Sequence, residues 1–492
     1  MDKWNNKVLL ILAVAGGAIG IGNFLRFPTL FAQYGGWFLI PYAISFFILG
    51  LPLMFVEWIL GTMARDNETH SLSTFLEKYF PGSKMKYLGV AAVACCLIIG
   101  GYYIYIESWM LGYAGISLTG YFNHFPSEKL GDFLGQYVSF DLGTKGTVIA
   151  VSALVISAFL NFYFVACGIS KGVSRLIRWS MPVLLVMALV ILVKVLLTPG
   201  IGEGIKYMFR GNISDLLNLS MWMDAAGQMF FSLSVGFTAT MVYVTYSKNN
   251  LNLFKDGLSS AFMNMGIEVF IASFIAIPVS FLAFGDKMEE VVHSSSIAFG
   301  MVSMSSIFSE IPGGSVWCFL WFFLLFVAAL TSSVSMVQVF ISFFCDKFGI
   351  TRFKSATVSG ILWLCVFLAV ILVQGGIDEF DFWTNLVLMP IGALMMIFIV
   401  WKLGDKFGKT FNENSKMKMG FFEYLIKIVT PLYLLAVMIP YVYKNGWDII
   451  ICKNYETSQL GEIWILRGII ILYFAEITVC ISRKTKKYKQ AD

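Results

Sequence analysis

The amino-acid sequence predicts an all-α polytopic membrane protein with about twelve transmembrane helices, and three observations support this fold class. First, 58% of the 492 residues are hydrophobic and only 13% are charged, whereas about 25% of residues are charged in soluble domains. Second, the apolar residues form segments of about 20 residues, the length that a helix needs to cross a ~30 Å bilayer core. Third, two of these segments are interrupted by glycine and polar residues at corresponding places in two halves of the chain, which is typical of an inverted repeat.

The predicted spans follow one another along the whole chain. Their approximate limits are 7–28, 36–62, 86–115, 146–166, 173–198, 220–247, 257–284, 314–345, 355–375, 381–403, 422–443 and 463–482. The first span has no small-residue cleavage signature, so we expect a retained helix and not a signal peptide. We treat 1–492 as one transmembrane domain, with a first repeat at 7–198, a second at 220–403 and two additional helices at 422–482.

The placement of basic residues predicts the orientation of the chain. Five lysines lie between positions 402 and 418, in a connection that the span count assigns to the same side as the N-terminus. The C-terminal tail adds Arg483, Lys484, Lys486, Lys487 and Lys489. Cytoplasmic connections carry the excess of Lys and Arg, so we expect both termini in the cytoplasm. A lipid-binding patch is the alternative interpretation of the basic tail, but topology alone explains it.

Several classes of protein are disfavoured. The eight cysteines form no C-x-x-C pair, and His70, His124 and His293 all lie in polar connections, outside the spans. A metal enzyme or haem protein therefore lacks its ligands, and no phosphate-binding loop indicates ATP-driven transport. We expect no enzymatic activity, no organic cofactor and no nucleic-acid partner.

The two interrupted spans are the most informative segments. The first carries four glycines within 16–22, each costing roughly 1 kcal/mol in a helix relative to alanine. The sixth carries a polar interruption at 232–237 (SLSVGF). Unwound backbone inside a membrane is tolerated where it lines a cavity, so matched breaks predict a binding site near the bilayer midplane. For the first span alone, the alternative is a glycine-rich helix-packing face.

The first span also carries a family resemblance. Its segment 16–28 (GGAIGIGNFLRFP) is similar to the first-helix signature of the neurotransmitter:sodium symporters, especially the bacterial amino-acid transporters that resemble the bacterial leucine transporter. Further matching blocks are 102–109 (YYIYIESW), 227–237 (GQMFFSLSVGF), 328–333 (AALTSS) and 378–383 (DEFDFW). The resemblance covers nearly the whole chain and implies sodium-coupled uptake of an amino acid by alternating access, in a multi-pass cell membrane protein.

The resemblance implies two Na+ sites. The first uses the Ala18 carbonyl and the side chains of Asn23, Ser232 and Asn264, completed by the substrate carboxylate. The second uses the carbonyls of Gly16, Ile19 and Ala328 with the hydroxyls of Thr331 and Ser332. The alternative for these two hydroxyls is a hydrogen bond back to their own helix.

The resemblance also implies how the substrate is recognised. Tyr103 and the freed amides of a half-helix are expected to bind its carboxylate. The full expected substrate site is Gly17, Ala18, Ile21, Gly22, Ile99, Tyr103, Phe231, Ser232, Ser234, Phe237, Ser332 and Met336. Monoamine carriers of the family have an aspartate where this chain has Gly20, so we expect a substrate with its own carboxylate.

The expected site contains no charged side chain, which favours a neutral, largely apolar amino acid. Gly17 departs from the asparagine of the leucine transporter and leaves room for a bulkier side chain. Leucine, methionine and an aromatic amino acid remain open.

The acidic residues Glu57, Glu107 and Glu268 lie within the spans. Glu268 is expected to adjoin Tyr42, Gln228, Ser232 and Asn264, where chloride-dependent relatives bind an anion. It therefore predicts chloride independence, and it leaves proton counter-movement open. We interpret Glu57 and Glu107 as structural hydrogen-bonding groups, with a transport role as the alternative.

The resemblance places gates on both sides of the site. Arg26 and Asp381 are expected to pair at the outer gate, with Phe231 as an aromatic lid. Trp4 and Asp346 match inner-gate positions, and Tyr246 and Gln338 match their supporting residues.

The inner gate departs from the family, because the usual arginine three residues before the tryptophan falls at Met1. Lys3 or the terminal amine is a candidate to replace it. Gly172 and Pro182 resemble a fifth-helix motif that permits local unwinding, and an ordinary helix start with a kink is the alternative.

Three other functions stay open from the sequence: a membrane sensor that binds an amino acid, a carrier of another carboxylate-bearing solute, and a channel. The expected partners are a small neutral amino acid and the lipid bilayer.

Overall fold

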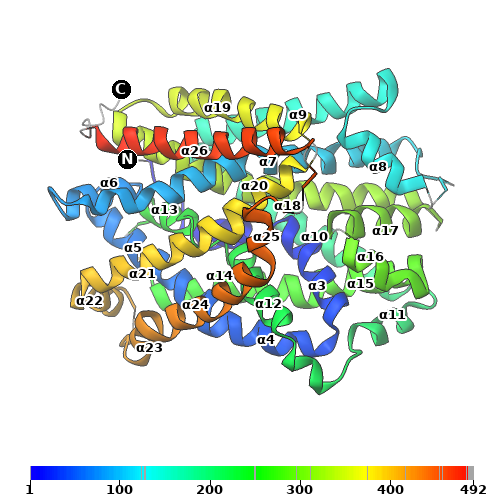
Figure 1. Ribbon diagram of the computed structural model, residues 1–492, viewed down its shortest axis with the longest axis horizontal. Coiled ribbons are helices and arrows are strands. Elements are labelled where there is room, and N and C mark those ends of the chain that lie inside the picture. Colours follow the sequence, from blue (N-terminus) through cyan, green and yellow to red (C-terminus); the bar gives the residue numbers. More distant parts are fainter. Residues whose placement is uncertain are drawn as a thin grey trace.

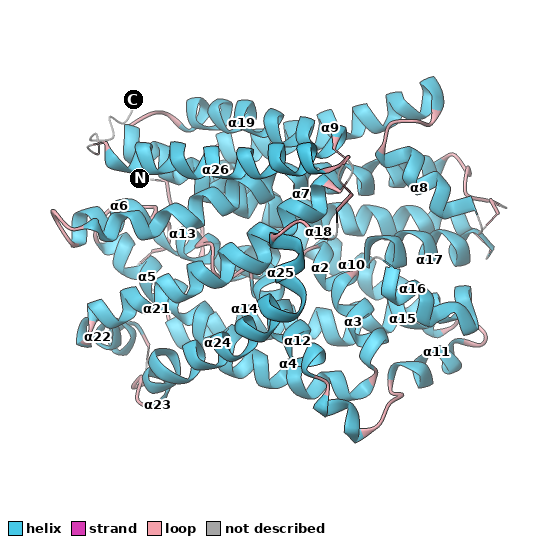
Figure 2. Ribbon diagram, in the orientation of Figure 1, coloured by secondary structure: helices cyan, strands magenta, loops and turns pink. Residues whose placement is uncertain are grey.

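The computed structural model describes residues 2–123, 125–126, 129–248, 251–294, 296–310, 312–373, 375–415, 417–453, 455–456, 458–483 and 485. Every regular element in these ranges is helical (Figure 2). Met1, His124 and the tail lysines Lys484, Lys486, Lys487 and Lys489 lie outside the described residues.

The α-helices lie beside one another in a single bundle (Figure 1). Their bounds are α1 (Lys7–Ala18), α2 (Ile21–Phe24), α3 (Arg26–Tyr34), α4 (Leu39–Ser45), α5 (Leu51–Asp66), α6 (Leu72–Tyr79), α7 (Val90–Leu118), α8 (Leu130–Val138), α9 (Gly143–Ala166), α10 (Ser174–Leu196), α11 (Ile201–Met208), α12 (Leu219–Leu233), α13 (Ala239–Thr245), α14 (Leu253–Gly266), α15 (Ser273–Phe284), α16 (Met288–Ser294), α17 (Ser296–Glu310), α18 (Gly314–Phe348), α19 (Arg352–Leu372), α20 (Gly376–Asp381), α21 (Met389–Leu403), α22 (Asp405–Asn414), α23 (Phe421–Tyr424), α24 (Thr430–Tyr441), α25 (Trp447–Ile450) and α26 (Leu460–Ser482).

The predicted class of polytopic helical membrane protein is confirmed. Among the described residues, ten continuous helices are long and apolar enough to cross a membrane. They are Gly36–Asp66, Lys84–Leu118, Gly143–Ala166, Ile169–Leu196, Leu253–His293, Gly314–Phe348, Arg352–Leu372, Gly376–Leu403, Phe421–Lys444 and Leu460–Ser482.

The two interrupted spans account for the difference from the predicted twelve. Lys7–Ala18 and Ile21–Tyr34 qualify as one span only together, because the chain bends by 61° between them. The predicted sixth span is divided into α12 and α13, of 15 and 7 residues, each too short to cross a bilayer alone. Length and hydropathy therefore recognise eleven spans, and the twelfth prediction corresponds to this second broken helix.

The spans differ in how deeply they are buried. The most apolar windows of Lys84–Leu118 and Gly314–Phe348 are 94% and 89% buried, so these two long helices form the centre of the bundle. The windows of Gly143–Ala166 and Phe421–Lys444 are only 28% and 17% buried, so these helices are peripheral. In water such exposed apolar helices would be unfavourable, and in a bilayer they face lipid.

Short helices close the two ends of the bundle. In Figure 1, α6 and α22 lie at the end where both chain termini lie, whereas α8, α11 and α17 lie at the opposite end. Termini at one end agree with an even number of membrane crossings. The sequence pattern of long apolar segments does not predict these short helices.

Candidate functional site

The first break separates α1 from α2. The last helical hydrogen bond of α1 comes from the residue after it, because the Ile19 amide donates to Ala15 O at 2.7 Å. Ile19 (ψ 96°) and Gly20 (ψ −165°) are then extended, and α2 begins at Ile21. The carbonyls at the end of α1 consequently lack helical donors and are free to bind another group.

The second break separates α12 from α13. Ser234, Gly236 and Thr238 have φ values of 50°, 100° and 68°. A Cβ atom at Gly236 would lie 2.8 Å from the Met389 carbonyl oxygen, so both the left-handed backbone and the close approach require glycine there. This local geometry ends one half-helix and begins the next.

Glu57 of α5 stabilises the second break. Its carboxylate accepts hydrogen bonds from the amides of Gly236 (3.0 Å), Thr238 (3.1 Å) and Met241 (3.2 Å). A fully buried carboxylate thus occupies the N-terminal end of α13, where free amides and the helix dipole favour negative charge. These contacts support the structural interpretation of Glu57.

The two breaks meet in the middle of the bundle. The Ser234 hydroxyl donates to the Gly17 carbonyl at 2.9 Å, and the Ile21 amide donates to the Tyr103 hydroxyl at 3.1 Å. A Cβ atom at Gly20 would lie 2.7 Å from both the Tyr103 hydroxyl and Ser332 Oγ. Tyr103 and Ser332 therefore converge on the unwound segment.

Two of the three side chains predicted for the first sodium site, Asn23 and Asn264, contact each other. Asn23 Nδ2 donates to Asn264 Oδ1 at 2.8 Å, and Asn23 Oδ1 accepts from the Gly20 amide at 2.9 Å. Both asparagines are buried, at 1% and 0% exposure. They bring amide oxygens to the end of α1 that carries the Ala18 carbonyl.

Glu268 connects this cluster to α12. Its carboxylate accepts from Ser232 Oγ (2.6 Å), Gln228 Nε2 (2.6 Å) and the Tyr42 hydroxyl (2.7 Å). The structure thus places Glu268 in contact with three of the four neighbours expected for it, and these four side chains, Glu268 included, are buried. Among the described residues, Glu268 has no basic group within ion-pair distance, so neutral donors hold this carboxylate.

The groups predicted for the second sodium site come from α1 and α18. Ser332 Oγ lies 3.5 Å from the Gly16 carbonyl oxygen and 3.4 Å from that of Ile19. Thr331 Oγ1 instead donates within α18, to the carbonyls of Ala328 (2.9 Å) and Val327 (3.3 Å). Back-bonding therefore applies to Thr331, whereas Ser332 reaches across to the broken helix.

The remaining residues of the expected substrate site are apolar or small. Ile99, Phe237 and Met336 are buried, and Phe231 is half-buried. A Cβ atom at Gly17 would touch Ser335 at 3.1 Å, and one at Gly22 would lie 3.8 Å from Phe231 Cβ. The glycines of the first break thus allow α18 and α12 to approach it closely.

The predicted outer gate consists of two separate contacts in this structure. The Arg26 guanidinium lies 3.9 Å from the centre of the Phe231 ring, and its Nη1 is buried without a hydrogen-bond partner. Asp381 accepts from the Tyr102 hydroxyl at 3.0 Å and from Asn385 Nδ2. Within the described residues these two charges form no ion pair, so their pairing stays a prediction.

The predicted inner-gate residues lie at the end of the bundle that holds both chain termini. Trp4 Nε1 donates to the Tyr243 carbonyl at 2.8 Å, and the Trp4 amide donates to the Tyr246 carbonyl at 3.1 Å. The Tyr246 hydroxyl hydrogen-bonds to Ser342 (2.9 Å), to which Gln338 Nε2 donates at 2.7 Å. The N-terminal segment is therefore fixed against α13, which the Tyr246–Ser342 bond links to α18.

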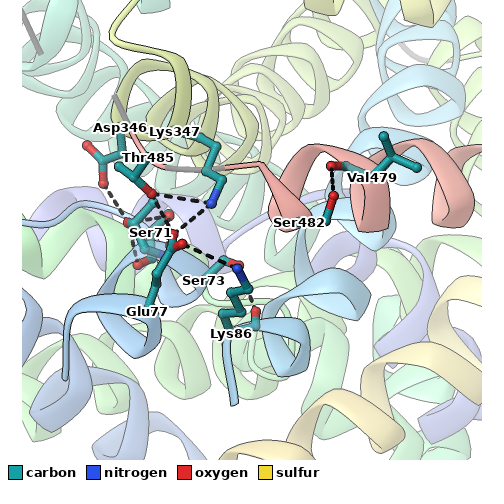
Figure 3. A network of polar contacts seen from close by, with 10 residues as sticks. Ser71, Ser73, Glu77, Lys86, Asp346, Lys347, Val479, Ser482 and Thr485 are labelled. Atoms are coloured by element: carbon teal, nitrogen blue, oxygen red, sulfur yellow. Dashed lines mark hydrogen bonds and ion pairs between the residues drawn. The ribbon is translucent and has the colours of Figure 1, made fainter. Parts of the chain in front are cut away.

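Asp346 and Lys347 attach the end of α18 to α6 (Figure 3). Asp346 accepts from the His70 amide (2.5 Å) and Thr74 Oγ1 (2.9 Å), and Lys347 Nζ lies 2.6 Å from Glu77 Oε2. Although burial acts in the opposite direction, hydrogen bonds from Lys347 and Thr485 hold the pKa of Glu77 below its usual value. This network joins a loop, a long helix and the C-terminal tail.

Sequence reasoning missed several polar residues of the site region. Asn161 of α9 donates to both Glu107 carboxylate oxygens at 3.1 Å, and Ser333 donates to one at 2.6 Å. These contacts support a structural interpretation of Glu107. In the sequence, Asn161 could have been recognised only as a polar side chain inside the apolar span 146–166.

Sequence reasoning also missed an ion pair at the inner end, where Asp2 and Arg352 lie 3.6 Å apart.

Comparisons with known proteins agree with this architecture. The sequence matches the sodium:neurotransmitter symporter family over residues 1–126 and 136–485. An uncharacterized sodium-dependent transporter of Methanocaldococcus jannaschii is 29% identical, covering 99% of this chain and 98% of the relative. An uncharacterized sodium-dependent transporter of Bacillus subtilis is 27% identical, with 89% and 97% covered. The crystal structure of MhsT in complex with L-phenylalanine superimposes with a TM-score of 0.77 at 25% identity, covering 89% of this chain and 99% of MhsT.

Proposed function

This chain belongs to the sodium:neurotransmitter symporter family, and from that premise we propose that it imports a neutral, largely apolar amino acid by sodium symport, without requiring chloride. The family consists of multi-pass membrane transporters, so the chain is a sodium-dependent transporter and not an enzyme. The substrate, the sodium sites and the anion independence are our proposals.

The meeting of the two helix breaks is the observation that supports this function best. Ser234 contacts the Gly17 carbonyl, while Tyr103 and Ser332 converge on Gly20. The amide of Ile21, at the start of α2, points to the Tyr103 hydroxyl. A substrate carboxylate at this place would accept hydrogen bonds from the hydroxyl and from the amides of the half-helix.

Sodium coupling follows from the oxygen atoms beside the carboxylate position. Asn23, Asn264 and Ser232 with the Ala18 carbonyl form the first proposed site, and Ser332 with the carbonyls of Gly16 and Ile19 contributes to the second. Ala328 and Thr331 complete the second site if the Thr331 hydroxyl turns its lone pairs toward the ion. A carboxylate shared between substrate and ion would make each bind more tightly in the presence of the other.

The apolar side chains of the proposed substrate site favour one class of substrate. Gly17, Ile21, Ile99, Phe231, Phe237 and Met336 offer no charge, so a charged substrate side chain would be buried without a partner. Gly20 leaves no space for the aspartate that monoamine recognition uses in this family. The relative MhsT was crystallised with L-phenylalanine, an amino acid of the proposed class.

Chloride independence rests on Glu268. Its carboxylate already accepts from Ser232, Gln228 and Tyr42, which are the donors that an anion at this place would need. A chloride ion there would meet negative charge and find its donors occupied.

The proposed cycle requires gates that close in turn. Arg26 and Asp381, with Phe231, would close the outer side, and the Trp4 segment with Asp346 would close the inner side. We place both termini in the cytoplasm. Sodium and substrate drive the cycle because they bind some conformations better than others.

Thermal unfolding of the purified protein tests this function. We expect one apolar amino acid to raise the unfolding temperature in sodium chloride and in sodium gluconate but not in choline chloride, because a ligand of the native state stabilises it. Stabilisation without sodium would contradict the proposed coupling, and the absence of stabilisation by any neutral amino acid would contradict the substrate class. Uptake of the labelled amino acid into liposomes distinguishes a carrier from a sensor.

A further inference from the structure

The N-terminal arm, residues 2–6, lies across the inner end of the bundle. Besides the contacts of Trp4, Asn5 Nδ2 donates to the Ser170 carbonyl at 3.3 Å, and Lys248 Nζ donates to the Asn5 carbonyl at 3.1 Å. Trp4 is 1% exposed. The arm thus packs against both the start of the helix Ile169–Leu196 and the end of α13.

Asp2 attaches the arm to the start of the helix Ile169–Leu196. Its carboxylate accepts from the amides of Ile169 (2.5 Å) and Ser170 (2.9 Å). These are free amides of a helix N-terminus, where negative charge is favoured. Asp2 therefore caps a helix that lies more than 160 residues away in the sequence.

Gly168 makes this cap possible. It has a φ of +84°, and a Cβ atom there would lie 2.6 Å from Asp2 Oδ2. A side chain at this position would both strain the backbone and displace the carboxylate. Glycine at position 168 therefore leaves the space that the Asp2 carboxylate occupies.

Arg352 attaches Asp2 to two further helices. Its guanidinium lies 3.6 Å from Asp2 Oδ2 and donates to Gln338 Oε1 of α18 at 3.1 Å. It also lies 5.2 Å from the centre of the Tyr246 ring. The Arg352 and Asp2 side chains are 16% and 27% exposed, so the pair is only partly screened by solvent.

We propose that Asp2 and Arg352 form the latch of the inner gate, so that the acid lies on the N-terminal arm and the arginine at the start of α19. This proposal rests on the proposed transport function. It assigns to Arg352 the role for which Lys3 was a sequence-based candidate. Lys3 is exposed and forms no ion pair in the part of the chain that the structure describes.

The latch connects gate opening to the helix Ile169–Leu196. When the arm leaves, that helix loses the cap on its first turn, which is π-helical over Ile169–Val173. The same helix contacts the first break, because a Cβ atom at Gly16 would lie 2.7 Å from Met181 Sδ. Release of Asp2 would therefore loosen a helix that packs against Gly16, whose carbonyl belongs to the proposed second sodium site.

Alkylation of a cysteine behind the gate tests the latch. Ser335 is 2% exposed and adjoins Gly17, which also lies close to Tyr243, the ring on which Trp4 packs. We therefore expect a Ser335→Cys variant to react with a water-soluble maleimide when the inner side opens. Labelling at position 335 is read by peptide mass spectrometry. In this background we expect Asp2→Asn and Arg352→Gln each to raise the labelling rate about threefold or more, and the double variant no more than the larger single effect.

Two further variants sharpen the test. Lys354→Gln removes an equal charge from the same turn of α19, and its labelling should equal that of the Ser335→Cys parent. Gly168→Ala should raise labelling with Arg352 intact, because it displaces Asp2. Unchanged labelling in Asp2→Asn and Arg352→Gln, or single effects that multiply in the double variant, would overturn the latch.

A separate measurement keeps the two proposals distinguishable. Sodium-dependent stabilisation by an amino acid in the wild type and in Arg352→Gln, both with Ser335 intact, shows that both are folded and bind ligand. If the wild type lacks this stabilisation, the proposed function fails, whereas the labelling comparison still decides whether Asp2 and Arg352 hold the gate.

Discussion

At the scale of single residues, Gly20 has an extended backbone and lies at the proposed binding site. It lies between the Tyr103 hydroxyl and Ser332 Oγ, each 2.7 Å from where its Cβ would be. Contacts this short force the neighbouring groups to move, and both neighbours are hydroxyls of the proposed binding site. The position therefore excludes any side chain as long as Tyr103 and Ser332 keep their places.

We expect Gly20→Ala to abolish stabilisation by the amino acid while leaving the protein folded. The physical reason is the displacement of Tyr103 and Ser332 from the carboxylate position. Thermal unfolding with and without substrate in sodium chloride measures this effect. Gly115→Ala is the control, since a Cβ at Gly115 of α7 meets nothing within 4 Å. Full substrate stabilisation in Gly20→Ala would contradict the proposed pose.

Glu268 offers a second prediction at this scale. Glu268→Ser removes the carboxylate but leaves Tyr42, Gln228 and Ser232 as donors without an acceptor. We expect the variant to require chloride, because an anion then satisfies these buried donors. The measurement is substrate stabilisation in sodium chloride compared with sodium gluconate. Glu290→Ser, at an exposed position, is the control, and equal stabilisation of Glu268→Ser in both salts would refute the assignment.

At the scale of elements, the half-helix α13 depends on a residue of another helix. The Met241 amide in its first turn and the Gly236 and Thr238 amides just before it donate to Glu57, whose side chain is fully buried. Without this carboxylate the amides would be buried and unsatisfied, which costs about 1–3 kcal/mol per group.

We expect Glu57→Gln to lower the free energy of unfolding by about 2 kcal/mol or more, because the glutamine NH2 group faces amide donors. The unfolding temperature in detergent measures this change. Glu413→Gln on the exposed face of α22 removes the same charge without removing a cap, so its unfolding temperature should not change. An unaltered temperature in Glu57→Gln would show that water satisfies these amides.

His70, in the loop between α5 and α6, makes the stability of the folded protein depend on pH. Burial, with a smaller contribution from Arg352 and partial opposition from Asp2, lowers the pKa of His70 from 6.5 to about 4. Its imidazole also hydrogen-bonds to Thr245 Oγ1 at 2.9 Å and stacks on Tyr246. Below pH 6.5 the unfolded chain binds a proton that the folded chain does not. Stability therefore falls as the pH decreases from 6.5 to about 4, and it is fully retained above 6.5.

We expect this group to cost about 2 kcal/mol of stability at about pH 5 relative to neutral pH. His70→Gln removes the titration, so its unfolding temperature should decrease less between these two pH values than that of the wild type. Parallel decreases in both proteins would contradict the prediction.

At the scale of the whole molecule, an ion pair connects the last helix, α26, to α20. Arg467 of α26 lies 2.6 Å from Glu379 of α20, and the two side chains are 6% and 0% exposed. Arg467 also donates to the carbonyls of Ile450 and Ile449, and Glu379 accepts from Trp383 and Tyr455. Glu379 precedes Asp381, a residue of the proposed outer gate, by two positions, so α26 holds the helix that carries it.

We expect Arg467→Met to destabilise the protein by about 3–5 kcal/mol, because Glu379 would remain buried without its cation. The double variant Arg467→Met with Glu379→Gln should be less destabilised than Arg467→Met alone. Unfolding temperatures of the wild type, both single variants and the double variant measure this coupling. Additive effects would indicate that the two side chains act independently.

The sequence by itself determined the membrane class, the spans, the two breaks and the family. Hydropathy and glycine content are local properties, and lipid tolerates few alternatives to long apolar helices. The predicted limits 86–115 and 463–482, for example, agree closely with Lys84–Leu118 and Leu460–Ser482. Most of the site residues came from the resemblance, and their roles stay predictions.

Only the tertiary structure decided which polar groups meet. Asn23 and Asn264 are 241 residues apart, Asp2 and Ile169 are 167 apart, and Arg467 and Glu379 are 88 apart. A buried charge needs a partner, but local sequence does not state which helix supplies it. The packing of the helices determines the partner, as it does for Arg352 of α19, which lies beside Asp2 of the N-terminal arm.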